Sequence, residues 1–318
     1  RQRQMCIRDR ALMAAKRRWG CPCILDVRDI WPEAIVNMGI ARPWHPGIAY
    51  LSRLERMGCR TADHIVTTAP SQASNIVKRG LKPEANVTAV PHGVSLERYD
   101  SIAPGTRDAV RRKLGIEDEQ KLVMYVGAHG PLYNLTQLVD LAEAVADRPD
   151  IQFVSVGEGT ERRQLMAEVE RRGLGNLRFV GSIPYDEVPD YLSSADIACS
   201  IVRAEAVPGW DEETKGTFRS ALFDYAAARL PVVFNDPGYT ARELQDRAGA
   251  GLYGDTADGI GELAGHVRFL ADHPEERQRM GGNNYREIAE RYSRPKMAAQ
   301  YSDILEGLLP SLAASPAI

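Results

Sequence analysis

The sequence lacks several features that mark particular classes of protein. None of its apolar runs approaches the roughly 20 residues that cross a bilayer, and no segment has the pattern of a secretory signal. It contains neither a D-x-D nor an H-E-x-x-H motif. The first two absences argue against an integral membrane protein and a secreted one, and the third leaves no recognisable metal-binding motif. We expect a cytoplasmic protein, with the inner face of the membrane as an alternative location.

Cysteine and histidine are scarce, and neither is arranged for metal binding. The five cysteines are an odd number, and Cys21-Pro22-Cys23 has no second pair at metal-ligand spacing. None of the six histidines belongs to a recognisable triad or metal cluster. We therefore expect reduced thiols, as in a reducing compartment, and no metal site.

The composition is that of a globular protein, but its charge is unevenly distributed. The 318 residues, 44% of them hydrophobic, suggest two domains. Residues 1–110 hold 17 Lys and Arg against 10 Asp and Glu, a net charge of +7, which leaves −10 for the remainder. A basic first part could lie against an anionic membrane or meet a phosphate-bearing acceptor, although such a bias more often marks only a solvated face. No basic stripe interleaved with aromatic residues indicates nucleic acid.

Apolar strand patterns alternate with helical patterns along most of the chain. We expect strands at 23–27, 64–68, 87–90, 122–126, 151–156, 177–180, 197–201 and 232–234. Repeated strand–helix units predict an α/β fold with parallel sheets. The first ten residues have no periodicity and read as a foreign leader, and residues 95–107, with Pro104-Gly105, read as a linker. The expected domains cover 11–104, which we expect to be incomplete, and 105–295, followed by a helix over 296–318.

The stretch 216–238 carries the most specific signal. A Gly-containing loop leads into a short amphipathic helix, which precedes the strand at 232–234. The start of such a helix presents unpaired backbone N–H groups that suit a phosphate. The carboxylate of Asp224 could accept hydrogen bonds from two sugar hydroxyls. An ordinary αβ unit with a surface Asp explains the local pattern equally well.

Three further segments lie where predicted strands end, the edge at which ligands bind in open parallel sheets. Gly127-Ala128-His129-Gly130 can turn its amides toward a pyrophosphate, and the small residues of Gly157-Glu158-Gly159 would let a flat base approach. Tight turns without a ligand explain both loops as well. Arg28 and Asp29 could orient a hydroxyl acceptor or stabilise developing charge, with a plain surface ion pair as the alternative.

In this order the motifs resemble those of retaining GT-B glycosyltransferases of family 4, in the bacterial subgroup that builds lipopolysaccharide, capsule and exopolysaccharide. Residues 26–33 (DVRDIWPE) resemble the segment D-L-W-P-E of that subgroup. Residues 62–68 through 90–94 resemble its block A-D-x-I-V-x-x-S … I-P-N-G-V, and residues 220–233 resemble S-K-L-F-E-Y-M-A-A-G-x-P-V-V. The resemblance runs from about Ala11 to Leu309.

The resemblance implies two Rossmann-like domains that face a cleft, with the nucleotide-sugar held by the C-terminal one. Asp224 falls on the acid that binds the ribose diol, and 127–130 fall on the loop near the diphosphate. Residues 157–159 with Phe179 and Val180 fall near the base. Ser220 and Leu222 lie in the matched helix, and the helix from Lys296 would cross back to the N-terminal domain. Such enzymes usually need no metal or other cofactor beyond the nucleotide-sugar itself.

The sequence departs from the family pattern at several positions. Gly216 stands where the first, sugar-facing carboxylate is usual, and Ala221 stands where a diphosphate-binding Lys is usual. Arg219 could supply the missing charge. His92 replaces the usual Asn, and the glycine-rich loop expected near the acceptor is not in the chain.

We therefore expect a glycosyltransferase that moves a sugar, with retention, to a glycan or lipid-linked acceptor in cell-envelope polysaccharide synthesis. Two alternatives stay open. One is a nucleotide-sugar-binding domain that has lost catalysis, which the departures would explain. The other is a nucleotide-sugar 2-epimerase, which would need clustered acid/base carboxylates and histidines.

Overall fold

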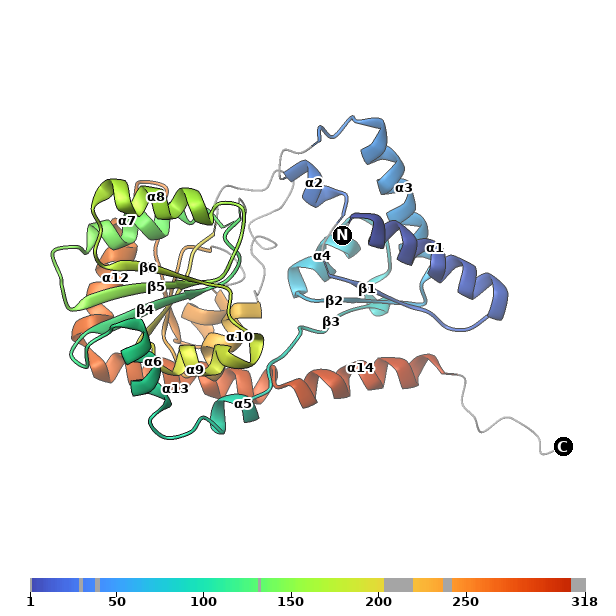
Figure 1. Cartoon of the computed structure of the whole chain (residues 1–318). Helices are drawn as coiled ribbons and strands as arrows, with labels where there is room; N and C mark the ends of the chain where they lie inside the picture. The colour runs from blue at the N-terminus through green and yellow to red at the C-terminus, as the bar shows by residue number, and fades with distance from the viewer. Residues whose placement is uncertain are drawn as a thin grey trace. The chain divides into compact units, whose positions relative to one another are not determined.

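The computed structural model describes residues 2–28, 31–37, 41–130, 133–202, 220–236 and 242–309. These residues form two compact units (Figure 1). The first contains the chain up to residue 92 together with residues of the last helix, and the second contains 93–202 and 220–294. Both units have a parallel sheet flanked by helices, so the expected α/β fold is confirmed.

The first unit is built on a three-stranded parallel sheet of order β1-β2-β3. Its elements are α1 (Gln2–Trp19), β1 (Ile24–Val27), α2 (Glu33–Asn37), α3 (Pro46–Thr61), β2 (His64–Thr67), α4 (Pro70–Lys78), η1 (Glu84–Asn86), β3 (Val87–Ala89) and α14 (Arg294–Leu308). Ile65, Ile76 and Leu81 are central to its small core. Asp63 ties α1 to the sheet, because its carboxylate accepts from Lys16 Nζ at 2.6 Å and from the Cys23 N–H at 2.8 Å.

The second unit is larger. In chain order, its elements up to the loop before β7 are α5 (Glu97–Asp100), α6 (Thr106–Leu114), β4 (Lys121–Val126), α7 (Thr136–Ala144), β5 (Ile151–Val156), α8 (Arg162–Arg172), β6 (Leu177–Gly181), η2 (Tyr185–Glu187) and α9 (Val188–Ser193). The remainder are β7 (Ile197–Ser200), α10 (Ser220–Ala227), β8 (Val232–Phe234), the π-helical η3 (Arg242–Arg247), β9 (Gly251–Tyr253), α12 (Gly261–Asp272) and α13 (Pro274–Arg291).

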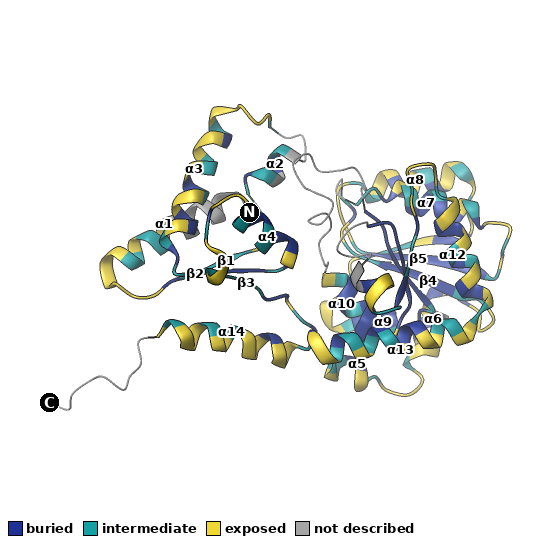
Figure 2. Cartoon of the chain, turned by 180° about the vertical axis from the view of Figure 1, so that it is seen from behind, coloured by how far each residue is buried: buried dark blue, intermediate teal, exposed yellow. Residues whose placement is uncertain are grey.

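The six-stranded sheet of this unit has the order β6-β5-β4-β7-β8-β9, all parallel. Helices cover both faces, with α7, α8 and α12 on one and α6, α9 and α10 on the other (Figure 1). Strands buried on both faces read as continuous apolar runs rather than alternating ones, and every residue of β5 is buried (Figure 2). The strand order reverses between β4 and β7, and in such sheets that reversal marks the ligand site.

Two expectations about helices need correction. Residues 2–10, which were expected to lack periodic structure, form the first part of α1, because their Arg, Gln and Met residues are good helix formers. The segment 95–107 is not a simple linker, since it contains α5 and the start of α6 and belongs to the second unit. Tyr99 in this segment is buried.

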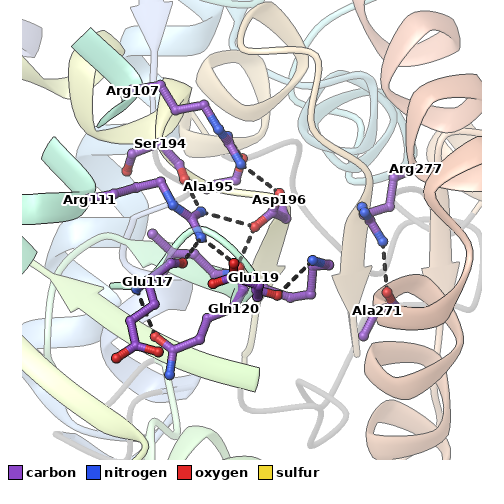
Figure 3. Close-up of polar contacts among 12 residues, drawn as sticks. Arg107, Arg111, Glu117, Glu119, Gln120, Ser194, Ala195, Asp196, Ala271 and Arg277 are labelled. Carbon is purple, nitrogen blue, oxygen red and sulfur yellow. Dashed lines mark hydrogen bonds and ion pairs between the residues drawn. The ribbon is translucent and has the colours of Figure 1, made fainter. Parts of the chain in front are cut away.

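A buried arginine joins α6 to the sheet of the second unit (Figure 3). Arg111 is 2% exposed, and its guanidinium donates four hydrogen bonds. The acceptors are the carbonyl oxygens of Ser194, Glu117 and Gln120 and the carboxylate of Asp196. Asp196 also accepts from the Leu122 N–H at 2.8 Å, at the second residue of β4. Arg111 therefore connects α6, the start of β4 and the turn before β7.

We expect Arg111→Met to lower the free energy of unfolding by about 3–5 kcal/mol, because the half-buried Asp196 carboxylate would lose its buried cationic partner and three carbonyls would lose a donor. Urea denaturation measures the loss. Arg107→Met is the matched control, since Arg107 also bonds Asp196, at 2.8 Å, but has a 44% exposed side chain. We expect about 0–1 kcal/mol there. An equal loss of unfolding free energy in the two variants would show that the buried position of Arg111 adds nothing to stability.

Candidate nucleotide-binding site

The hydroxyl of Tyr225 lies where β4 and β7 stop pairing. The ladder between these strands ends at Met124 and Ala198. Beyond that point the Tyr225 hydroxyl accepts a hydrogen bond from the Val126 N–H at 2.8 Å. It lies 3.3 Å from the carbonyl oxygens of both Val126 and Cys199, to one of which it donates. Burial raises the pKa of Tyr225 well above its ordinary value, so the phenol keeps its proton. Tyr225 thus holds α10 at the carboxyl edge of the sheet.

The loops after β4 and β5 are joined backbone to backbone at the same edge. The His129 N–H donates to the Glu158 carbonyl at 2.9 Å, and the Glu161 N–H donates to the His129 carbonyl at 3.0 Å. A Cβ on Gly157 would lie 1.8 Å from the Gly127 carbonyl oxygen, and one on Gly159 would lie 2.1 Å from that of His129. No real Cβ approaches so closely, and Gly157 also has φ +147°. These two glycines are required by the approach of the loops.

His129 supports this loop from inside the protein. Its side chain is fully buried, its Nε2 is 2.8 Å from Ser155 Oγ, and its ring packs against those of Tyr125 and Phe179. Burial, and then the charge of Arg162, lower the pKa of His129, so the ring is neutral at physiological pH. Any contact of His129 with a ligand must therefore come from its backbone. Ala128 is exposed beside it, and Gly130 has open space at its Cα.

The residues expected near the base lie at the ends of β5 and β6. Phe179 and Val180 are half-buried, and Glu158 is exposed and lies 3.5 Å from Arg162. The Gly157 N–H donates to the Gly181 carbonyl at 2.8 Å, which joins this loop to the end of β6. The arrangement is compatible with a flat ligand at this edge, and the role of these residues stays a prediction.

Within α10 the three matched residues have different environments. Ser220 is exposed at the first residue, whereas the Leu222 side chain is fully buried in the core, so only its backbone could meet a ligand. Asp224 is half-buried, and its Oδ1 accepts a hydrogen bond from the hydroxyl of Tyr99 at 2.6 Å. Burial raises the pKa of Asp224, while this hydrogen bond and the charges of Arg98 and Arg294 act to lower it.

Two tyrosines at this edge were not predicted as site residues. Tyr225 lies inside the stretch singled out from the sequence, next to Asp224, and its buried position on the helix could have indicated it. Tyr99 lies in the expected linker, where no periodic pattern pointed to a buried side chain.

In the first unit Arg28 lies at the end of β1. Its guanidinium is exposed and 3.6 Å from Asp26, and its carbonyl oxygen accepts from Gln72 Nε2 at 2.8 Å. Asp29 and Arg219 lie outside the described residues. In the described part of the chain no three His, Cys, Asp or Glu side chains gather so as to hold a metal ion.

A family model described as "Glycosyl transferases group 1" matches residues 106–287, which include both glycine loops and α10. The chain belongs to this family.

Two relatives and two solved structures illustrate the similarity. WcaI of Escherichia coli (strain K12), named for glycosyl transfer in colanic acid biosynthesis, is 29% identical over 185 residues, 58% of this chain and 44% of WcaI. A GDP-mannose-dependent monoacylated alpha-(1-6)-phosphatidylinositol monomannoside mannosyltransferase of Corynebacterium glutamicum is 25% identical over 221 residues, 68% of this chain and 55% of that one. The chain thus spans about half the length of these relatives.

Among solved structures, Anabaena Alr3699/HepE in complex with UDP matches with a TM-score of 0.73 at 16% identity, over 96% of this chain and 77% of that one. WaaG, a glycosyltransferase involved in lipopolysaccharide biosynthesis, matches with a TM-score of 0.70 at 18% identity, over 88% and 75%. These similarities confirm the expected GT-B fold.

We expect Gly157→Ala to lower the free energy of unfolding by about 1–3 kcal/mol or more, because the new methyl group must push the two loops apart. Gly130→Ala in the neighbouring loop is the control, since its Cβ would meet nothing within 4 Å. Thermal unfolding of both variants gives the comparison. A fully stable Gly157→Ala protein would show that the two loops are not held together as described.

Proposed function

We propose that the complete protein transfers a sugar, with retention, from a nucleotide-diphosphate sugar to a glycan or lipid-linked acceptor in cell-envelope polysaccharide synthesis. The observation that carries the proposal is the edge at the β4–β7 reversal. There the glycine loops after β4 and β5 are joined backbone to backbone, and α10, which carries Asp224, is held at the same edge by the Tyr225 hydroxyl. Family membership supports transfer, and the names of the relatives and neighbours support a nucleotide-sugar donor and a cell-envelope product.

In this proposal each part of the edge binds one part of the donor. The Asp224 carboxylate accepts from the ribose hydroxyls. The amides of 127–130 and the start of α10 at Ser220, with Arg219, bind the diphosphate, since helix N-termini and clustered N–H groups favour anions. The segments 157–159 and 179–180 contact the base.

The chemical step in this proposal depends on position and charge rather than on a strong nucleophile. Attack of the acceptor from the face that the diphosphate leaves would retain configuration, and no metal ion is invoked. Cationic and N–H groups around the diphosphate would stabilise the negative charge that develops on it. Arg28 and Asp29 would orient the acceptor.

A second reading is a donor-binding domain without catalysis. Gly216 and Ala221, at positions where the family pattern has a carboxylate and a Lys, favour it. Transfer or hydrolysis of the donor by the complete protein separates the two readings. The 2-epimerase alternative has less support, because the one described histidine in the edge loops is buried and bonded to Ser155.

A thermal-shift screen with UDP-, GDP- and dTDP-sugars tests donor binding. A donor at 100 times its Kd should stabilise the fold by about 2.7 kcal/mol. Asp224→Asn should weaken that binding by about 1.5–3 kcal/mol, because a charged acceptor for the ribose hydroxyls is lost. Asp118→Asn, an exposed change in the turn before β4, is the control. The proposal fails if no sugar nucleotide stabilises the protein, or if Asp224→Asn binds as tightly as the control.

We also propose that the first unit contacts an anionic membrane through the outer face of α3. Tyr50, Arg53, Arg56, Met57 and Arg60 are exposed at helical spacing, and Trp44 before the helix is 74% exposed. This set is the α3 basic face. It presents no exposed acid, because Glu55 is largely buried and bonded to Arg79 at 2.6 Å. Basic helices with exposed aromatic residues favour anionic lipid surfaces. None of the described helices has the length and apolar character to cross a bilayer.

Sedimentation with phosphatidylglycerol vesicles tests this contact. Changing Arg53 and Arg56 to Glu should weaken binding by more than about 2 kcal/mol, at about 1 kcal/mol per arginine near the surface. The same double change at the exposed Arg163 and Arg171 of α8 gives a protein of equal net charge as the control. Equal sedimentation of the two variants, or equal binding to phosphatidylcholine, would contradict the proposal.

A further inference from the structure

Tyr99 makes a short, partly buried hydrogen bond to the carboxylate of Asp224. Its side chain is only 4% exposed, and its hydroxyl is 2.6 Å from Asp224 Oδ1. Burial, and then the charge of Asp224, raise the pKa of Tyr99 far above its ordinary value. The phenol is therefore protonated at any physiological pH, and it donates to the carboxylate.

The helix that carries Tyr99 is fixed on both sides of it. Arg98 donates to the Tyr185 carbonyl at 2.6 Å and lies 4.1 Å from the centre of the Tyr185 ring. Asp100 accepts from Arg229 at 2.9 Å and from the Tyr285 hydroxyl at 2.7 Å. With both neighbours bonded to other elements, Tyr99 is a rigid support for whatever its hydroxyl binds.

The bond from Tyr99 leaves Asp224 able to accept more. An ionised carboxylate has about four lone-pair sites on its two oxygens, and one phenol takes one of them. Fixing Oδ1 also fixes the direction of Oδ2, because the carboxylate is a rigid plane. An Asp side chain without such a bond can rotate about its torsion angles. It would lose this freedom on binding its ligand, and the lost entropy would lower the affinity.

We propose that Tyr99 is a positioning residue for the sugar nucleotide, which orients the Asp224 carboxylate toward the ribose hydroxyls before the donor arrives. The inference rests on the proposed function, since it takes Asp224 as the ribose acceptor. Tyr99 itself does not touch the donor. Its effect on binding passes through Asp224 alone.

The charges around Asp224 predict how donor binding depends on pH. Arg98 from α5 and Arg294 at the start of α14 face the carboxylate and favour its ionised form, as the Tyr99 hydrogen bond does, while burial favours the protonated form. A protonated Asp224 loses an acceptor, so donor binding weakens as pH falls. Removing the Tyr99 hydroxyl raises the pKa of Asp224, and the loss of binding then begins at a higher pH.

Tyr99→Phe in the full chain tests the inference, with UDP, GDP and dTDP titrated separately and calorimetrically. We expect Kd to rise about tenfold, the lower end for a hydrogen bond to a charged group, and the acidic loss of binding to begin at higher pH. In an Asp224→Asn background the same change should have no further effect. Tyr285→Phe is the matched control, because it removes a phenol–carboxylate bond of 2.7 Å to Asp100 on the same helix but leaves the bond from Arg229 that also fixes Asp100. Its Kd and pH profile should equal those of the unchanged protein.

Each result decides between distinct conclusions, provided that thermal unfolding shows each variant to be folded. If Tyr99→Phe weakens binding equally with and without Asp224, Tyr99 acts on general structure and the inference is wrong. Unchanged nucleotide binding by Tyr99→Phe also overturns the inference. Tighter binding overturns it too, because it would mean that the phenol competes with the ribose hydroxyls for Asp224. If Asp224→Asn itself binds normally, or if none of the three nucleotides binds, the proposed function fails and the inference fails with it. Should Tyr99→Phe not fold, Tyr99→Met, which fills the buried site and also lacks a donor, replaces it under the same criteria.

Discussion

The second unit depends on one hydroxyl at the place where its sheet opens. Two parallel strands that diverge leave backbone N–H and C=O groups unpaired, and such groups are costly inside a protein. Between β4 and β7 the Tyr225 hydroxyl serves as both acceptor and donor, so it replaces a ladder bond with a side chain. The Val126 N–H and one of the two nearby carbonyls therefore keep a partner where the sheet opens, and α10 is fixed at the opening.

Close backbone contacts also fix the loops after β4 and β5, on the other side of the opening. The loops after β4 and β5 lie so close that the carbonyl oxygens of Gly127 and His129 occupy the space that a Cβ would need on Gly157 and Gly159. Only glycine allows that approach, so Gly157 and Gly159 have a structural cause that needs no ligand. The approach leaves a short, rigid edge, and rigid edges are where binding groups can be held in place.

Much of the fold was predictable because buried parallel strands give a strong and simple signal. Val123 and Phe153 lie in strands that the sequence placed within a residue or two, and the same apolar runs predicted the parallel sheet. The short helix α5 was not predictable, because four residues are too few to show a helical period. Tyr99 therefore looked like part of a linker. The site was harder to predict, since a motif places a residue in the chain but does not say which way its side chain points. Leu222 and His129 were expected at the ligand, and both side chains are buried.

The surroundings of Asp224 show why a partly buried acid at such an edge needs neighbours. Burial penalises the charged form, and an Asp left alone there would tend to keep its proton and lose an acceptor. Tyr99, Arg98 and Arg294 each favour ionisation, two of them from the short helix that the sequence did not reveal. The two arginines contribute charge without direction, whereas the phenol contributes a bond of fixed geometry. For a carboxylate that must accept two hydroxyls at once, direction matters as much as charge, and Tyr99 is the one of these three groups that supplies it.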